Sequence, residues 1–363
     1  MYADDFLQQK LDERTAKQSL RSLRLSQGMV DFCSNDYLGI ARKHLLKPLS
    51  LSDMATGSTG SRLLAGHYPL LEQVEEQIAL FHEAPAALIY NSGYDANLGL
   101  LSAIPQKNDT ILYDQLSHAS IRDGIRLSFA QSYSFAHNDM NDLRKKIQQA
   151  TGNIFIVTES VFSMDGDSCP IEELAAIANE NNAHLIIDEA HATGVIGPRG
   201  AGLVQMHGLQ SQLFARIHTF GKACGCHGAV VLGSERLKTY LINFSRSLLY
   251  TTALPEHAVA LIGESYRLFP AMDAERKHLT ELIHIFQHTT IRYNRLPSST
   301  PIQGIVVPGN REVKALAEKL QQAGFDVRPI LYPTVPEGKE RLRIVIHAYN
   351  TEKELQQLLG LLA

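Results

Sequence analysis

The sequence has no tryptophan and only four cysteines among its 363 residues. Cysteines this few and this irregularly spaced, at Cys33, Cys169, Cys224 and Cys226, do not form the disulfide framework of a small secreted protein. Their one close pair, Cys-x-Cys, is a weak indication of a metal site, and we expect no metal. No apolar run is long enough to cross a bilayer, and the first residues lack the basic and apolar regions of a signal peptide. We therefore expect a reduced, cytoplasmic protein.

An excess of basic charge is also missing. The formal net charge is −4 and the calculated isoelectric point is near 6.4, so the chain lacks the electrostatic footprint of a nucleic-acid-binding protein. No polybasic stretch predicts binding to a membrane surface. Hydrophobic residues make up 44% of the sequence and charged residues 20%, as in ordinary globular domains. The composition argues against a nucleic-acid partner, a membrane partner and a disordered chain.

Short apolar runs alternate with helical patterns through the first two thirds of the chain. Uninterrupted runs are typical of strands buried on both faces of a parallel sheet, and we predict such strands at residues 86–90, 110–113, 154–158 and 185–188. Near the end, Thr351 and Glu354 form a capping box for a last helix. We predict an α/β protein with an N-terminal segment at 1–40, a large domain with a mainly parallel sheet at 41–245, and a smaller α+β domain at 246–363.

Lys222 lies between two apolar runs, in the stretch Thr219-Phe220-Gly221-Lys222-Ala223-Cys224-Gly225-Cys226-His227-Gly228. Burial disfavours the charged form of a lysine, and a neutral amine is a nucleophile that forms a Schiff base with a carbonyl group. The glycines leave room for a flat group to approach the backbone. A lysine on a solvated turn is the alternative interpretation, so the hypothesis requires partners elsewhere in the chain.

Other polar residues follow the predicted strands in the same way. In parallel sheets, functional side chains gather beyond the carboxyl ends of the strands. The residues at these positions are His118, Glu159 with Ser163, and Asp188 with His191. The turn Ser92-Gly93-Tyr94 opens a helix after another strand, and such a helix start can seat a phosphate. Many strand-to-helix turns look alike, and a lone histidine is more often packed than catalytic.

Asp188 ends a buried strand, where an unpaired carboxylate is unfavourable. A cationic partner such as a protonated pyridine ring would stabilise it, and a helix cap is the alternative. Asp188-Glu189-Ala190-His191 also spells the DEAH box of helicases, but the sequence contains no Walker A loop, so an ATPase is not favoured. A lysine, a carboxylate, a flat histidine and a phosphate seat together indicate a pyridine aldehyde cofactor.

Five motifs resemble those of the α-oxoamine synthases, a family of pyridoxal 5′-phosphate (PLP) enzymes of fold type I. The motifs are Asn91-Ser92-Gly93-Tyr94-Asp95-Ala96-Asn97, Leu116-Ser117-His118-Ala119-Ser120, Thr158–Asp167, Asp188–Gly194 and Thr219–Lys222. Their order and spacing match the family over nearly the whole chain. The resemblance implies an aspartate-aminotransferase-like fold, PLP as the cofactor, and a homodimer whose active sites lie between the two subunits.

The resemblance also implies a role for each site residue. It makes Lys222 the imine lysine and the base that removes the α-proton of the substrate, with Asp188 at the pyridinium and His118 stacked on the ring. It adds His191 and Ser163 near the phenolic oxygen, Glu159 among the cofactor contacts, Ser92, Gly93, Tyr94 and Thr219 at the phosphate, and Thr252 from the neighbouring subunit. Arg343 and Asn35 are the implied substrate contacts, since the fork of a guanidinium matches a carboxylate bidentately.

The implied reaction is a decarboxylating Claisen condensation of an amino acid with an acyl-CoA, which yields an aminoketone, CoA and CO₂. The stretches 135–139, 163–170 and 195–200 resemble the branch of the family that uses L-alanine and pimeloyl-CoA in biotin biosynthesis. The alternatives that stay open are a glycine C-acetyltransferase, another α-oxoamine synthase, an aminotransferase of the same fold, and a PLP-binding protein without catalysis.

Six positions depart from the residues usual in the family. They are Leu71, Ala192, His227, Glu256, His347 and Asn350. None of them is among the implied cofactor contacts. Since His347 and Asn350 follow closely after Arg343 in the sequence, they bear on the choice of substrate.

Overall fold

The computed structural model describes residues 4–23, 25, 28–47 and 54–363, which form two compact units. The larger comprises Leu38–Phe162 and Ser168–Arg276, and the smaller comprises the described residues up to Tyr37, Ser163–Asp167 and Lys277–Ala363. The division near residue 276 differs from the boundary expected at 245, because α10 (Glu256–Leu268) packs against α2 (Pro69–Phe81) within the larger unit. Across these described ranges, no helix is both long and apolar enough to cross a membrane.

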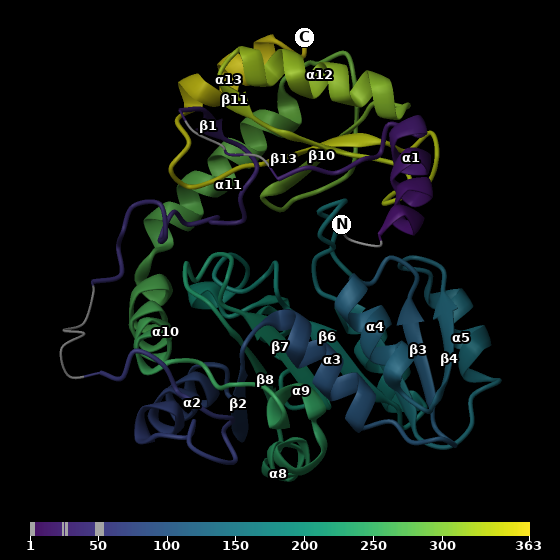
Figure 1. Cartoon of the computed structure of the whole chain (residues 1–363), viewed down its shortest axis with the longest axis vertical. Helices are drawn as coiled ribbons and strands as arrows, with labels where there is room; N and C mark the ends of the chain where they lie inside the picture. Colours follow the sequence, from purple (N-terminus) through teal and green to yellow (C-terminus); the bar gives the residue numbers. More distant parts are fainter. Residues whose placement is uncertain (1–3, 24, 26–27, 48–53) are drawn as a thin grey trace. The chain divides into compact units, whose positions relative to one another are not determined.

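A seven-stranded sheet forms the centre of the larger unit (Figure 1). Its strands lie in the order β2 (Ala86–Tyr90), β8 (Ala229–Gly233), β7 (Ala215–Thr219), β6 (His184–Asp188), β5 (Ile154–Glu159), β3 (Thr110–Asp114) and β4 (Gln131–Phe135). Strand β8 is antiparallel to both of its neighbours, and the other neighbouring pairs are parallel. The prediction of an α/β protein with a mainly parallel sheet is confirmed.

The composition of the strands explains which of them the sequence revealed. Strands β2, β3, β5 and β6 are almost entirely buried, so each reads as an uninterrupted apolar run. Strand β4 has the sequence Gln-Ser-Tyr-Ser-Phe and lies at the edge of the sheet, where only Phe135 is fully buried. Its polar side chains face solvent, which is why the pattern did not predict it.

Helices cover the sheet of the larger unit. Besides α2 and α10 they are α3 (Gly93–Ala103), α4 (Ala119–Leu127), α5 (Met140–Ile147), α6 (Ile171–Glu180), α7 (Leu203–Met206), α8 (Glu235–Phe244) and α9 (Arg246–Leu249), with short 3₁₀ turns at Pro198–Gly200 and Phe269–Ala271. Several starts follow from sequence: Pro69 occupies the first turn of α2, and Ser92 caps α3. Apolar residues of α3, α4, α8 and α9 pack with the strands into one core.

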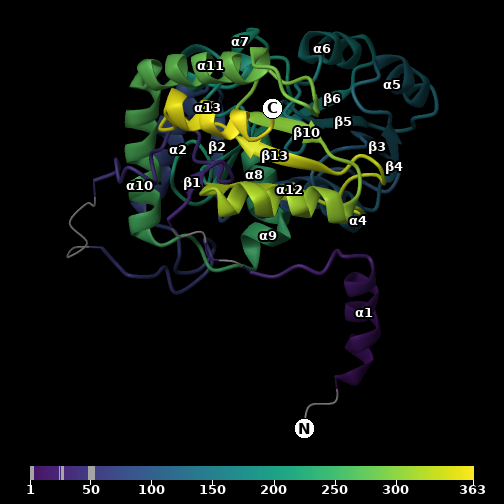
Figure 2. The same cartoon turned by 90° about the horizontal axis from the view of Figure 1, so that it is seen from above.

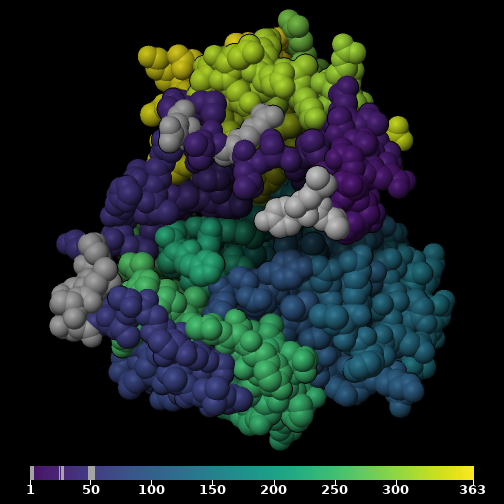
Figure 3. All heavy atoms as spheres, viewed as in Figure 1, coloured from purple at the N-terminus to yellow at the C-terminus, as the bar shows by residue number. Residues whose placement is uncertain are grey.

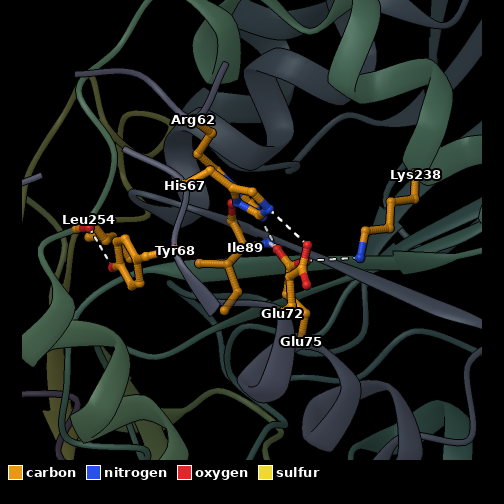
Figure 4. Close-up of polar contacts among 8 residues, drawn as sticks. All are labelled: Arg62, His67, Tyr68, Glu72, Glu75, Ile89, Lys238 and Leu254. Atoms are coloured by element: carbon orange, nitrogen blue, oxygen red, sulfur yellow. Dashed lines mark hydrogen bonds and ion pairs between the residues drawn. The ribbon is translucent and has the colours of Figure 1, made fainter. Parts of the chain in front are cut away.

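A carboxylate with three donors lies inside the larger unit (Figure 4). Glu75, on α2, is 1% exposed and accepts from Arg62 and from Lys238, whose Nζ is 2.9 Å away. The backbone N–H of Ile89 in β2 also donates to it at 2.8 Å. The helical pattern suggests a plain scaffold role for this face of α2, and the burial of an ion pair here ties α2, β2 and α8 together.

The smaller unit holds a four-stranded antiparallel sheet. Its order is β12 (Arg328–Ile330), β13 (Arg341–Val345), β10 (Ile302–Val306) and β9 (Asn294–Arg295), and a separate parallel pair joins β1 (Val30–Asp31) to β11 (Phe325–Asp326). Helices α12 (Asn310–Gln322) and α13 (Glu352–Gly360) lie over one face of the sheet (Figure 2), and α11 (Asp273–His288) leads into the unit. The predicted capping box is present, with Thr351 accepting from the Glu354 N–H.

Strand β13 brings two arginines into the interior of the smaller unit. All five of its residues are buried. Arg341 forms an ion pair with Asp165, and Arg343 is 9% exposed. The alternation of charged and apolar residues also permits a solvated face for this strand, and that interpretation of Arg343 is wrong because the guanidinium has partners inside the unit.

The sequence predicts a helix over residues 1–25, with an apolar stripe at Phe6, Leu7 and Leu11 that continues less regularly to Leu20 and Leu23. The described part of this segment forms a shorter helix. A 3₁₀ turn at Asp5–Leu7 leads into α1 (Gln8–Ala16), all of whose residues are exposed, and the helix is visible in purple on the surface in Figure 3. The helix stops because Gln18 has a positive φ of 50° and the N–H of Ser19 bonds back to the carbonyl of Arg14. Leu20 and Leu23 therefore lie beyond the helix.

Candidate active site

Lys222 lies in the turn between β7 and β8. Its Nζ is 2.9 Å from Nε2 of His191, which is 4% exposed and follows the end of β6. This turn requires glycine at position 225, because Gly225 has a positive φ of 65°. A Cβ at this position would also lie only 2.6 Å from the side chain of Ile40. The structure therefore brings together two of the predicted residues, an amine and an imidazole.

Asp188 ends β6 and is 6% exposed. Its carboxylate accepts from the backbone N–H of Ala190 at 2.9 Å and from Nδ2 of Asn97 at 2.7 Å. The segment that follows is a turn, so Asp188 is not a helix cap. In the register of the sheet, Asp188 pairs with Glu159 at the end of β5, which places two carboxylates on neighbouring strand ends.

Glu159 and His118 are joined through the backbone. Glu159 is 3% exposed, and its Oε1 accepts from the N–H of His118 at 2.6 Å. Burial, and then the charge of Asp188, raise the pKa of Glu159. His118 is an exposed residue that caps the start of α4, and its Nδ1 is 2.8 Å from Oγ of Ser120. Partial desolvation lowers the pKa of His118, the charge of Lys222 adds to that effect, and Asp188 opposes it.

The start of α3 approaches β7 very closely. A Cβ on Gly93 would lie 2.4 Å from the methyl group of Thr219, so only glycine fits. The hydroxyl of Thr219 is buried and has no hydrogen-bond partner within the described ranges of the chain. An orphaned donor beside the free N–H groups of a helix start is a site suited to an oxyanion.

The other residues predicted to hold a phosphate make different contacts. Ser92 accepts from the N–H of Asp95 as a helix cap, and its hydroxyl donates to the Asp95 carboxylate at 2.8 Å. Tyr94 donates its hydroxyl to Asp123, and its backbone lies in the first turn of α3. Thr252 is exposed, and its carbonyl accepts from Nδ2 of Asn91 at 2.8 Å.

The predicted substrate contacts lie in the smaller unit. Arg343 donates through Nε to the carbonyl of Ser163 at 2.7 Å and through an NH₂ group to Oδ1 of Asn35 at 2.9 Å. A guanidinium has five N–H groups, so these contacts orient Arg343 without exhausting its donors. Arg343, Asn35 and Ser163 thus lie together in the smaller unit. The larger unit contains the other predicted site residues, which are Ser92, Gly93, Tyr94, His118, Glu159, Asp188, His191, Thr219, Lys222 and Thr252.

Two of the departures from the family pattern bond to each other. His347 is fully buried, and its Nδ1 lies 3.1 Å from Oδ1 of Asn350. Its Nε2 lies 2.9 Å from the carbonyl of Ser34, and Nδ2 of Asn350 donates to the carbonyl of Asp31 at 3.1 Å. The pair therefore fastens the segment that carries Asn35. Among the others, Leu71 and Ala192 are buried, and His227 is exposed.

Two polar residues of this region were present in the motifs without an assigned role. Asn97 and Ser120 are each 1% exposed, and they join Asp188 to His118. The sequence indicates the burial of Asn97 only through its place among the apolar residues Ala96, Leu100 and Leu101 of α3. An unpaired amide is unfavourable in such surroundings. A polar residue on an apolar helix face requires a partner, but the sequence does not name it.

Comparison with known proteins gives consistent matches. The family model for class I and II aminotransferases matches residues 27–362. An 8-amino-7-oxononanoate synthase from Emericella nidulans is 42% identical and covers 99% of this chain and 95% of its own. The solved 8-amino-7-oxononanoate synthase of Francisella tularensis is 30% identical, with a TM-score of 0.80 over 92% of this chain and 96% of its own. Serine palmitoyltransferase from Sphingomonas wittichii is 25% identical, with a TM-score of 0.91 over 100% and 97%, and a serine palmitoyltransferase variant with PLP matches equally well.

Proposed function

Because the chain belongs to the class I and II aminotransferase family and, within it, to the α-oxoamine synthases, we propose that it condenses L-alanine with pimeloyl-CoA. The protein is an enzyme of this family, and its cofactor is PLP. The proposal rests chiefly on one observation, the contact of 2.9 Å between Nζ of Lys222 and Nε2 of His191 at the strand ends that also carry Asp188.

The residues at the start of α3 fit the phosphate of PLP. The orphaned hydroxyl of Thr219 supplies a donor, and Gly93 allows the backbone N–H groups of the helix start to approach. Ser92 and Tyr94 contribute through this same helix start. In the homodimer that we propose, Thr252 of the second subunit completes the phosphate contacts.

The residues around Lys222 fit the ring. When bound, PLP supplies an electron sink that stabilises negative charge on the substrate carbon next to the amino group. Asp188 provides the negative charge for the ring nitrogen, and the imidazole of His118, an exposed residue, offers a flat surface for the ring. Lys222 anchors the cofactor and takes up the α-proton of the substrate at Nζ, while His191 holds that amine in place.

Arg343 is the proposed contact for the carboxylate of the amino acid. Its guanidinium is held by Ser163 and Asn35, so a fork of N–H groups is oriented before the substrate arrives. His347 and Asn350 support this arrangement by fastening the segment next to Asn35. In this view the two departures form a matched pair that preserves the substrate contact.

The choice of substrates follows from the named relatives. A product called 8-amino-7-oxononanoate has a nine-carbon chain. A seven-carbon pimeloyl group and three-carbon alanine give nine carbons after one is lost as CO₂. A cytoplasmic place in biotin biosynthesis belongs to the same proposal.

The test is thiol release by the PLP-loaded enzyme from acyl-CoAs of different chain length, crossed with alanine, glycine and serine. We expect CoA release with pimeloyl-CoA and alanine and none with Lys222→Ala. Release with acetyl-CoA and glycine would assign a glycine C-acetyltransferase instead. Release with palmitoyl-CoA and serine would favour the reaction for which the Sphingomonas wittichii neighbour is named. No release with any pair would contradict the condensation itself.

A further inference from the structure

A chain of hydrogen bonds connects Asp188 to the imidazole of His118 through side chains of α3 and α4. Nδ2 of Asn97 donates to Oδ2 of Asp188 at 2.7 Å and to Oγ of Ser120 at 3.1 Å. Oγ of Ser120 lies 2.8 Å from Nδ1 of His118, and the backbone N–H of Ser120 donates to the same nitrogen at 3.2 Å. These hydrogen bonds run from the buried carboxylate of Asp188 to the ring of His118, an exposed residue.

The donors and acceptors in this chain permit a single arrangement of protons. An amide nitrogen donates two hydrogens, and Asn97 directs one to Asp188 and the other to Ser120. A backbone N–H only donates, so Nδ1 of His118 must present a lone pair to the N–H of Ser120. The hydroxyl of Ser120 therefore donates to Nδ1 as well. The proton of the neutral imidazole is left on Nε2.

The orientation of the Asn97 amide supports this reading. Its Oδ1 is buried and has no hydrogen-bond partner among the residues that the structure describes. A buried carbonyl without a partner is unfavourable. Turning the amide over would place Oδ1 against the carboxylate of Asp188 and leave Ser120 without its donor. The charge of Asp188 thus fixes the amide, and the amide in turn sets the direction of the Ser120 hydroxyl.

We propose that Asn97 and Ser120 are positioning residues that hold His118 as the neutral tautomer with its proton on Nε2. The use of this tautomer rests on the proposed function, in which the ring of His118 lies against PLP. A neutral imidazole adds no positive charge beside Lys222 and the ring, so the charge of Asp188 remains available to the ring nitrogen. The protein sets this state before any ligand binds.

The direct test is the protonation state of His118 in full-length protein labelled with ¹⁵N-histidine. Its NMR signals are assigned by their loss in His118→Asn. The proposal expects a protonated Nε2 and an unprotonated Nδ1 at neutral pH in the wild type. A wild-type signal with the proton on Nδ1 would overturn it. This readout needs no acyl transfer, so it stands apart from any failure of the proposed reaction.

Variants of two nearby serines separate positioning from packing. Ser120→Ala removes the hydroxyl donor, and we expect the ratio of the two tautomers to shift roughly three- to tenfold toward Nδ1–H. Ser120→Thr restores the donor and the wild-type ratio. The matched control is Ser117→Ala, since Ser117 is 4% exposed and its hydroxyl has no partner in the described part of the chain. If neither Ser120→Ala nor Ser117→Ala changed the tautomer ratio of His118, the hydrogen bonds through Ser120 would have no positioning role.

The holoenzyme supplies an independent measurement. We expect Ser120→Ala to lower kcat roughly three- to tenfold with the KM for acyl-CoA unchanged, and Ser120→Thr to recover it. If Ser120 had a purely structural role, Ser120→Ala would instead lower the melting temperature and leave kcat per folded molecule unchanged. That second outcome would contradict the proposal.

Discussion

Replacing Thr219 by valine separates cofactor binding from the stability of the protein without cofactor. The hydroxyl of Thr219 is buried and unpaired within the described structure. Valine has nearly the same shape and no hydroxyl, so the change removes a desolvated group, and the free energy of unfolding stays the same or rises by up to about 1 kcal/mol. With PLP bound, the same hydroxyl would donate to a phosphate oxygen, a charge-assisted bond worth about 1.5–3 kcal/mol. The expected loss of PLP affinity is therefore roughly ten- to hundredfold.

Two assays measure these opposite effects. Thermal unfolding of the protein without cofactor gives the stability, and titration with PLP followed by absorbance gives the affinity. Thr158→Val is the matched control, since the hydroxyl of Thr158 on β5 is also buried without a partner in the described structure. The control should keep both its stability and its affinity for PLP. A Thr219→Val variant that bound PLP as tightly as wild type would refute the assignment of Thr219 to the phosphate.

Three further predictions concern buried charges and the substrate contact. Glu75→Ala leaves two cations without their carboxylate and should lower the free energy of unfolding in urea by roughly 3–5 kcal/mol. The control Glu72→Ala removes an exposed carboxylate on the same helix and should change this free energy by less than about 0.5 kcal/mol. Equal losses in the two variants would contradict the role of the buried carboxylate. Burial lowers the pKa of His82 to about 3. In the unfolded chain this imidazole takes up a proton near pH 6.5, so its contribution to stability is complete above that pH and falls by about 1.4 kcal/mol per pH unit toward pH 3. The free energy of unfolding of His82→Gln should fall less steeply over this range. An unchanged slope would contradict the role of His82 in acid unfolding. Arg343→Lys removes a bidentate fork and should raise the KM for the amino acid roughly tenfold or more while the PLP absorbance stays unchanged; an unchanged KM would exclude Arg343 from the substrate contact.

Much of the fold was predictable because buried strands consist largely of consecutive apolar residues. Strands β3, β5 and β6 each have a neighbour on both sides in the sheet, and β2 lies at its edge but is fully buried. All four read as apolar runs. The edge strand β4 carries polar side chains that face solvent, and no local pattern marks it as a strand. The boundary between the units was also hidden, because the packing of α10 on α2 depends on contacts between distant parts of the chain.

The candidate site was predictable where chemistry depends on strand ends. Lys222, Asp188 and His191 follow strands of one sheet, and a parallel topology gathers such residues at one edge. The connections between them were not predictable. Asn97 and Ser120 act through contacts between two helices, and neither residue type nor helical spacing says which buried polar groups pair with each other.

Glu75 and Arg343 show the same limit for charged residues. Helical spacing places Glu75 on a face of α2 that reads as scaffold, yet its cationic partners come from a loop and from α8 far along the chain. Strand alternation permits a solvated Arg343, yet partners from two distant segments hold it inside the smaller unit. A buried charge requires a counterpart, and its counterpart becomes visible only in the folded chain.

The central claim is that the enzyme couples cleavage of an acyl-CoA thioester to decarboxylation of an amino acid. The most direct measurement follows L-alanine labelled with ¹³C in its carboxyl group, together with pimeloyl-CoA, and counts labelled CO₂ and free thiol in the same reaction. The account predicts one CO₂ for each thiol, and neither product with Lys222→Ala. Thiol without labelled CO₂, or a keto acid formed from alanine without thiol, would contradict it.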